Sequence, residues 1–371
     1  MITKEKCKIL KEIQELQKKK KPIPLCLLQK LAKCQPPLAT APIYGPYLQL
    51  VTDTLYQPGQ APLFSNFIFN IQYYNQGGYY TTYERLFTDL TGGPYQMPQS
   101  ASVSAINKYF TSKYGNTVPQ EVTDSIVVGK ILTEDAGNNS YVDLNTLNGY
   151  FKKAQDAGIK WGGYMFWSAG FKNASYPTTN LVNGTFGDIN AKYRSIYIGS
   201  GNTGACFTAE GETIYAWGSD PNGTQANTIL TSYAKAGFNV LILSFWNPSG
   251  NSDWVTDWTS IPKAKRQEII SNLRANYPGV KVLVSGGGAN GAVGPTYGSG
   301  TDWGNAIAQY AKDYDLDGVD LDLEGSLLGT WWSDANYQWL TDAVKAIAQT
   351  GGKDMFVSFA PVGPLMVNPS S

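Results

Sequence analysis

From about residue 44 onward, short runs of β-branched and aromatic residues alternate with segments whose apolar positions recur at helical spacing. Several of these helical segments, such as "TQANTILTSYAKAG", end in Gly, as helix C-termini commonly do. Eight runs are predicted to be strands, at residues 67–74, 125–132, 160–167, 213–218, 238–246, 280–287, 316–324 and 354–361. Because strands that alternate with helices are typical of a parallel α/β sheet or barrel, eight of them predict an α/β fold of the (β/α)8 TIM-barrel type.

The composition narrows the chemistry. The chain has 371 residues, of which 16% are charged and 13% aromatic, whereas disordered chains have high charge and few aromatics. It contains no His. Mechanisms that use imidazole as a base, a zinc ligand or a proton shuttle are therefore excluded, including the usual serine and cysteine triads. Acid–base chemistry must come from carboxylates, Tyr, Lys or Cys.

Charge is unevenly distributed. Residues 1–34 hold ten Lys and three Glu, although the whole chain has 29 basic and 29 acidic residues. The remainder is mildly acidic, so we expect no nucleic-acid partner, which would need a basic face. Residues 1–40 are interpreted as a Lys-rich N-terminal tail. No signal peptide is visible in it, and no stretch approaches the roughly 20 apolar residues of a membrane helix, so we expect no membrane span.

The most informative segment is "DYDLDGVDLDLEG" at 313–325. Side chains of a strand alternate between its two faces, so Asp320, Asp322 and Glu324 point to one side. In a barrel these three carboxylates would face the axis. Because like charges at strand spacing repel, at least one carboxyl is expected to keep its proton at neutral pH. A carboxyl with a raised pKa at the C-terminal end of a barrel strand suits a general acid.

Two other patterns overlap this region. Asp313, Asp315, Asp317, Gly318 and Glu324 match the calcium-loop pattern, but Asp320 stands where an apolar residue is normal and no second loop follows. The segment "SGGGANG" at 285–291 satisfies the dinucleotide pattern G-x-G-x-x-G, which requires a helix to start at once. Prolines and glycines at 295–300 argue against such a helix. We prefer glycines that let the backbone pass close to the barrel interior or a ligand.

The motifs together resemble glycoside hydrolase family 18, the chitinases. "DGVDLDLEG" resembles that family's D-x-x-D-x-D-x-E signature, and "VSGGG", one βα unit earlier, is similar to its S-x-G-G. "NIQYYN" at 70–75 resembles the sixth strand with its Q-x-Y-N, and "GGYMFWS" at 162–168 resembles the eighth strand, which ends in Trp. "FVSFAPVGP" at 356–364 is similar to the fifth strand.

The order of these motifs is circularly permuted relative to the family, or comes from tandem fragments. The strands are expected in the order 6-7-8-1-2-3-4-5, with residues 41–200 forming the back part of the barrel (strands 6–8) and 201–371 the front part (strands 1–5). Residues 172–212, rich in Asn, Gly, Thr and Ser, are predicted to form the longest connection. A cut in an exposed loop is physically tolerable in a barrel. An excerpt from tandem barrels remains the alternative.

The resemblance implies a retaining endo-glycosidase that cleaves β-1,4-linked N-acetylglucosamine by substrate-assisted catalysis, without metal or cofactor. Glu324 would be the acid, Asp322 would orient the substrate's acetamido group, Asp320 would share charge behind it, and Tyr74 would donate its hydroxyl to the acetamido carbonyl. Expected substrate contacts are Trp167 as the apolar floor, with Gln72, Asn75, Phe245 and Trp217.

Alternatives to this function stay open. An endo-β-N-acetylglucosaminidase acting on N-glycans would use the same fold. A non-catalytic chitin-binding, glycan-binding or structural protein would result if the two parts failed to align. The expected partners are chitin or N-acetylglucosamine oligosaccharides. Oligomeric state and location stay open, although the family is commonly secreted.

Overall fold

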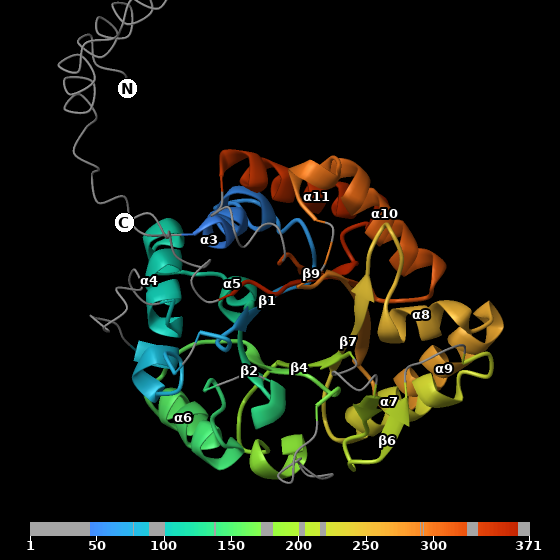
Figure 1. Ribbon diagram of the computed structural model, residues 1–371. Helices are drawn as coiled ribbons and strands as arrows, with labels where there is room; N and C mark the ends of the chain where they lie inside the picture. The colour runs from blue at the N-terminus through green and yellow to red at the C-terminus, as the bar shows by residue number, and fades with distance from the viewer. Residues whose placement is uncertain are drawn as a thin grey trace, which may run out of the picture. The chain divides into compact units, whose positions relative to one another are not determined.

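Eight parallel strands close into a barrel in the computed structural model (Figure 1). The structure describes residues 45–76, 78–88, 101–136, 139–171, 181–199, 205–215, 220–289, 291, 293–324 and 333–362. The predicted Lys-rich tail lies outside these residues. The barrel strands are β1 (Phe67–Gln72), β2 (Ile126–Ile131), β3 (Gly163–Trp167), β4 (Tyr193–Ile198), β7 (Val240–Trp246), β8 (Lys281–Gly287), β9 (Gly318–Asp322) and β10 (Phe356–Phe359).

Each barrel strand pairs in parallel with the barrel strands before and after it in the chain, and β10 pairs with β1 to close the ring. The predicted (β/α)8 fold is confirmed. Strands β1 to β4 lie before residue 200 and β7 to β10 after residue 201, and both sets belong to one barrel. The closed ring leaves no strand edge exposed, as expected for a barrel.

One predicted strand is wrong. Residues 213–218 were expected to supply a barrel strand, but β6 (Thr213–Tyr215) pairs antiparallel with β5 (Ala205–Phe207) in a separate two-stranded sheet. The barrel strand in this part of the chain is β4, which lies within 172–212, the predicted connection. It contacts β3 on one side and β7 on the other. The run "YRSIYI" alternates between the barrel interior and the helical layer, and burial on both sides makes it a strand.

Helices lie outside the strands (Figure 1). Four of the long helices begin at a Ser or Asp whose side chain accepts a backbone N–H of the first turn, namely Ser102, Asp143, Ser299 and Ser333. The α-helices are α3 (Pro46–Leu50), α4 (Val103–Tyr114), α5 (Gln120–Asp124), α6 (Leu144–Asp156), α7 (Thr224–Lys235), α8 (Asp253–Ser260), α9 (Lys263–Asn276), α10 (Gly300–Asp313) and α11 (Asp334–Gly351). Single helical turns are η1 (Val51–Leu55), η2 (Glu84–Thr88), η3 (Glu134–Ala136), η4 (Leu181–Thr185) and η5 (Pro295–Tyr297). No helix among the described residues is long and apolar enough to cross a membrane.

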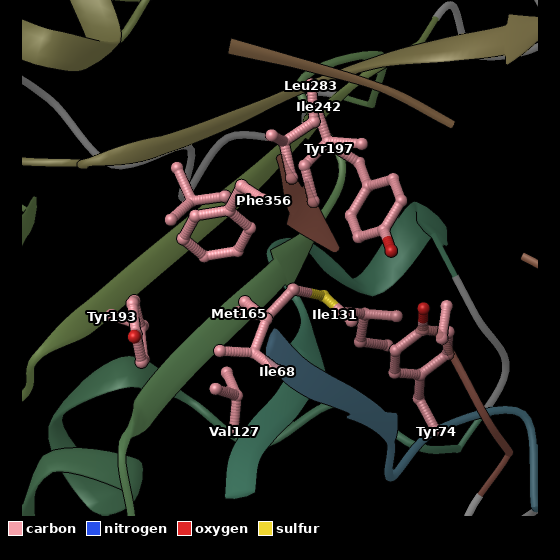
Figure 2. Close-up of a cluster of buried hydrophobic side chains, with 12 residues drawn as sticks. Ile68, Tyr74, Val127, Ile131, Met165, Tyr193, Tyr197, Ile242, Leu283 and Phe356 are labelled. Carbon is pink, nitrogen blue, oxygen red and sulfur yellow. The ribbon is translucent and has the colours of Figure 1, made fainter. Parts of the chain in front are cut away.

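The barrel interior is packed with side chains from alternate strand positions (Figure 2). Every strand presents one set of alternate residues inward and the other set toward the helices, as strand geometry requires. The inward apolar cluster consists of Ile68, Tyr74, Val127, Ile131, Met165, Tyr193, Tyr197, Val240, Ile242, Leu283, Phe356 and Ala360. Polar residues interrupt this set on β1, β4, β8, β9 and β10, and most of them converge on one place.

Candidate functional site

Strand β9 brings the three acidic residues to the barrel interior. Asp320 and Asp322 are two residues apart on β9 and buried, and Glu324 follows the strand's C-terminal end and is half-buried. Leu321 and Leu323 lie between them and are fully buried. The alternation predicted from the sequence is therefore present. The row of carboxyls leads from the barrel interior to the C-terminal end of the strand, where TIM barrels place their active sites.

Asp320 is held by hydroxyl groups from three other strands. Its Oδ2 accepts hydrogen bonds from Tyr197 Oη on β4 at 2.9 Å and from Ser285 Oγ on β8 at 2.7 Å. Its Oδ1 accepts a hydrogen bond from Ser358 Oγ on β10. Burial raises the pKa of Asp320, and the three donors oppose that rise. Both carboxylate oxygens of Asp320 thus accept hydrogen bonds from other strands.

Gln72 joins the other two acids. Its Nε2 donates to Asp322 Oδ1 at 3.0 Å, to Glu324 Oε1 at 2.8 Å and to the carbonyl of Ala360 at 2.9 Å. Gln72 ends β1, so these contacts connect two strands that are separated by β10. The expected contact of Gln72 with substrate stays a prediction, and its amide group also bridges the two carboxyls.

The carboxyls of Asp322 and Glu324 hydrogen bond to each other, so their ionisations are linked. Burial, followed by the charges of Glu324 and Asp320, raises the pKa of Asp322 well above its usual value. Burial also raises the pKa of Glu324, and its hydrogen bonds from Gln72 and Asp322 oppose that rise. Their mutual hydrogen bond raises the pKa of Asp322 and lowers that of Glu324. The upward direction at Asp322 has the cause named by the like-charge argument, because the neighbouring carboxylates favour a proton there.

Two tyrosines border the acids, Tyr74 in the segment after β1 and Tyr197 on β4. Figure 2 shows their hydroxyl groups pointing toward each other. Burial raises the pKa of Tyr74, and the charges of Asp322, Glu324 and Asp320 raise it further, which places the phenol near the carboxyls. Among the described residues the Tyr74 hydroxyl has no hydrogen-bond partner. It is therefore a free donor beside the acids. The next residue, Asn75, is exposed and has a φ of 57°.

Aromatic rings line the other side. Trp167, at the end of β3, is half-buried and packs against the inward cluster. Its ring stacks on Phe245 with centroids 5.9 Å apart and meets Tyr197 at 5.4 Å. A Cβ added at Gly288, which has a φ of 79°, would lie 3.0 Å from the Phe245 ring. Trp167 and Phe245 thus form a stacked aromatic pair next to Tyr197. Trp217, the other predicted aromatic contact, lies outside the described residues.

The overlapping motifs have structural roles. Asp317 and Glu324 lie beyond opposite ends of β9, whose five residues span roughly 16 Å at about 3.3 Å per residue, so they cannot belong to one calcium loop. Asp317 instead accepts hydrogen bonds from Arg274 at 2.9 Å and from the backbone N–H of Val282 at 2.9 Å. Within the described ranges, no cluster of three acidic or Cys side chains is arranged to hold a metal ion.

The glycine run also differs from a dinucleotide site. After β8 the chain forms η5 and enters α10 only at Gly300, so no helix begins at the glycines. A Cβ at Gly287, with a φ of 109°, would lie 2.2 Å from the carbonyl oxygen of Asp322. The glycines therefore let β8 approach the acidic strand, as expected.

The sequence prediction missed the residues that hold Asp320. Tyr197, Ser285 and Ser358 each interrupt an apolar strand run with a hydroxyl group, "YRSIYI", "VKVLVS" and "FVSF". That interruption is the signal that the sequence offers, because a buried hydroxyl needs a hydrogen-bond partner. The signal can be used only when it is known which strand positions face the barrel interior.

Comparisons with known proteins give distant matches. No family model matches the sequence, and no curated protein matches it significantly. Among solved structures, a GH18 chitinase from Pseudoalteromonas aurantia matches with 18% identity and a TM-score of 0.26 over 38% of this chain and 53% of that one. A family 18 chitinase from Crocus vernus matches with 12% identity and a TM-score of 0.30, over 76% and 98%. The carboxyl transferase domain of Rhizobium etli pyruvate carboxylase matches at 9% and 0.30, over 69% and 41%.

The chain thus spans about half the length of the first of these chitinases and less than half of the carboxyl transferase domain. Both chitinases and the transferase match at low TM-scores, so the similarity does not distinguish between activities. The site geometry has to carry the functional argument.

Proposed function

We propose that the chain is a chitinase-like retaining glycoside hydrolase that cleaves β-1,4-linked N-acetylglucosamine oligosaccharides by substrate-assisted catalysis. One observation carries the proposal. A buried pair of carboxyls, Asp322 and Glu324, is bridged by Gln72 at the C-terminal end of a barrel, with the Tyr74 hydroxyl beside it and without a hydrogen-bond partner in the described part of the chain. The pair supplies one acid and one base within a few ångströms, and no imidazole is needed.

In the proposed reaction, Glu324 donates a proton to the glycosidic oxygen as the bond to the leaving sugar breaks. The acetamido carbonyl oxygen of the same substrate residue attacks the anomeric carbon and forms an oxazolinium ion. Asp322 accepts the acetamido N–H and stabilises the positive charge, while Tyr74 donates its hydroxyl to the acetamido oxygen. Glu324 then deprotonates a water that opens the ring, which restores the acid and retains the anomeric configuration.

Asp320 has a supporting part in this scheme. Its negative charge, held by Tyr197, Ser285 and Ser358, raises the pKa of Asp322. In this scheme Asp322 holds the proton and transfers it to Glu324 before the reaction. Glu324 is then protonated and can act as the acid. The half-buried Trp167 ring, supported by stacking on Phe245, is proposed as the apolar floor for a pyranose face. Asn75 is exposed next to Tyr74 and is proposed as a polar contact of the substrate.

We further propose that the barrel is circularly permuted relative to family 18. In this scheme β1, β2 and β3 correspond to strands six to eight, and β4, β7, β8, β9 and β10 correspond to strands one to five. The boundary between the two parts then lies between β3 and β4, before residue 193, rather than at 200. The ring closure of β10 on β1 supports this scheme, because it joins the fifth and sixth strands side by side.

The decisive experiment follows release of chromophore from a chromogenic chitotrioside by the purified chain. Glu324→Gln keeps the side chain's shape but cannot donate the proton, and we expect its turnover to fall by about 10² to 10⁴-fold. Glu268→Gln on α9 is the matched control, because it removes an exposed carboxylate that forms a surface ion pair with Lys265. Turnover by the parent and the control, with none by Glu324→Gln and with the β-anomer as the first product, supports the proposal.

Three results would point elsewhere. Full activity of Glu324→Gln would remove Glu324 as the acid. Binding of chitotriose without turnover by the folded parent would favour a non-catalytic glycan-binding protein. Turnover of an N-glycan core but not of the chitotrioside would favour an endo-β-N-acetylglucosaminidase.

A further inference from the structure

Lys130 is a buried cation without a carboxylate partner among the described residues. It lies near the C-terminal end of β2 and is 1% exposed. Its Nζ donates hydrogen bonds to three backbone carbonyls, those of Tyr73 at 2.8 Å, Tyr80 at 3.0 Å and Ser140 at 3.0 Å. The first two follow β1 and the third follows β2, so one ammonium group joins two neighbouring loops at the end of the barrel that holds the acids.

Stability alone does not account for this lysine. Removing an ammonium group from water is costly, and an apolar side chain of similar size is often at least as stabilising at such a position. Burial lowers the pKa of Lys130 to about 7. Three converging carbonyls match the three N–H donors of the charged form, whereas a neutral amine has only two donors. The local structure therefore suits an ammonium ion. The role of Lys130 follows from the backbone groups to which this ion donates hydrogen bonds.

The ammonium holds the backbone next to Tyr74. The N–H of Tyr73 donates to the carbonyl of Gly129 at 3.0 Å, and its own carbonyl accepts from Lys130. Both backbone groups of Tyr73 are thus bound to β2 just after β1 has ended at Gln72. The ring of Tyr73 meets that of Tyr80 edge-on with centroids 4.9 Å apart, and Lys130 binds the carbonyl of Tyr80 as well. The pairing of β1 with β2 is extended by one residue, directly before Tyr74.

Tyr74 depends on this attachment. Its hydroxyl has no hydrogen-bond partner among the described residues, so the side chain is not fixed at its tip. The residue after it, Asn75, turns the chain with a positive φ. Two things therefore set the position of the Tyr74 hydroxyl: the packing of its ring in the inward cluster and the backbone that carries it. On the Tyr73 side, the hydrogen bond from Lys130 is the last one on that backbone before Tyr74.

We propose that Lys130 is a positioning residue, whose ammonium group fixes the backbone at Tyr73 and thereby holds the Tyr74 hydroxyl beside Asp322 and Glu324. The proposal rests on the function proposed above, in which Tyr74 contacts the reacting acetamido group. It assigns Lys130 no contact with substrate. Its effect is on the alignment of a group that acts in the transition state, so it should appear in kcat rather than in KM.

The test compares Lys130→Met and Lys130→Arg with Lys152→Met as the control. Lys152 lies on α6 and forms an exposed ion pair with Asp188. In the chitotrioside assay we expect Lys130→Met to lose roughly 10- to 100-fold in kcat with little change in KM, the size expected for a displaced positioning group. Lys130→Arg should recover part of the loss because it keeps the charge and several N–H donors. Lys152→Met should match the parent.

A double-mutant cycle with Tyr74→Phe separates positioning from general weakening of the fold. If Lys130 acts through Tyr74, Lys130→Met should cost no more than about twofold once the hydroxyl is gone. Multiplication of the two losses would overturn the proposal, as would unchanged kcat in Lys130→Met. If Lys130→Met does not fold, Lys130→Gln, which keeps two N–H donors, takes its place in the same cycle.

Failure of the proposed function gives a different pattern. A parent chain that binds chitotriose without cleaving it refutes hydrolysis, and the same cycle is then measured in the Kd, where additive losses overturn the role of Lys130. If the parent neither cleaves nor binds chitotriose, the proposed substrate is refuted. Amide hydrogen exchange of the full chain then tests the attachment by Lys130. Faster exchange at residues 73–80 in Lys130→Met, but not in Lys152→Met, would support it. Unchanged exchange there in Lys130→Met would refute it.

Discussion

Replacement of Gln72 by Leu tests how the acidic pair is tuned. The amide Nε2 of Gln72 donates to Asp322 at 3.0 Å and to Glu324 at 2.8 Å, and these donations favour the charged forms of both carboxyls. Leu has nearly the same size but no donor. The variant therefore removes a stabilising influence on negative charge while leaving the apolar packing of the barrel in place. Both ionisations of the pair should then require a higher pH.

The size of the effect follows from the number of donors. A hydrogen bond to a charged group contributes about 1.5 to 3 kcal/mol. Gln72 has two N–H bonds for three acceptors, one of which is the Ala360 carbonyl at 2.9 Å, so the lower end of that range applies. About 1.4 kcal/mol corresponds to one pH unit. The two limbs of the pH profile should therefore both move to higher pH, and their two shifts should add up to about one unit. The two midpoints belong to the pair rather than to either residue.

The assay is kcat/KM for the chromogenic chitotrioside between pH 3 and 9. Asn70→Leu is the control, because Asn70 lies two residues earlier on β1, is fully buried, and its amide has no partner among the described residues. It should leave the profile in place. A profile of Gln72→Leu that loses height without moving, or that moves to lower pH, would refute the tuning role of Gln72.

Three other changes test the structure more widely. The folded pKa of Asp322 is raised above its unfolded value of about 4. The parent should therefore lose stability as the pH rises from about 4 toward neutral, whereas urea unfolding of Asp322→Asn should not show that part of the loss, and parallel curves would contradict the raised pKa. Gly287→Ala should lower the free energy of unfolding by about 3 kcal/mol or more, because its Cβ would meet a carbonyl oxygen at 2.2 Å, whereas Gly59→Ala, with a φ of 80° in open space, should lose only about 1 kcal/mol. Asp317→Ala should cost about 1 to 3 kcal/mol by thermal unfolding and leave KM unchanged, since it loses its bonds to Arg274 and the Val282 N–H at the far end of β9; a raised KM would place it at the site instead.

Periodicity predicted most of the barrel because seven of its strands are apolar runs bounded by Gly, Pro or polar segments. It failed between residues 172 and 218, where two short runs competed. The run at 213–215 pairs with Ala205–Phe207, and the run at 193–198 enters the barrel. Both contain β-branched and aromatic residues, and the surrounding Asn and Gly suggested a loop around the second. Only the neighbours β3 and β7 decide between them, and neighbours are a property of the tertiary structure.

The part of the site that lies along one strand could be predicted from the sequence. The alternation of Asp320, Asp322 and Glu324 is local, so their shared face followed from strand geometry. The role of Gln72 was not local. It depends on which face of β1 turns inward and on β1 lying one strand away from β9, 250 residues further along the chain. The same holds for the hydroxyl groups on Asp320, which come from three strands.

The closure of β10 on β1 links the stability of the ring to the acidic pair. At this seam the amide group of Gln72 binds the Ala360 carbonyl and both acids, and Ser358 of β10 binds Asp320. Gln72, which ends the first strand, is therefore hydrogen bonded to both the last strand and the acidic pair. A ligand that bound only the closed ring would stabilise the closure by RT ln(1 + [L]/Kd). An opening of the ring at the seam would dismantle the acidic pair while the helices and the remaining strand pairs were still intact, so chemistry and closure should be gained and lost together.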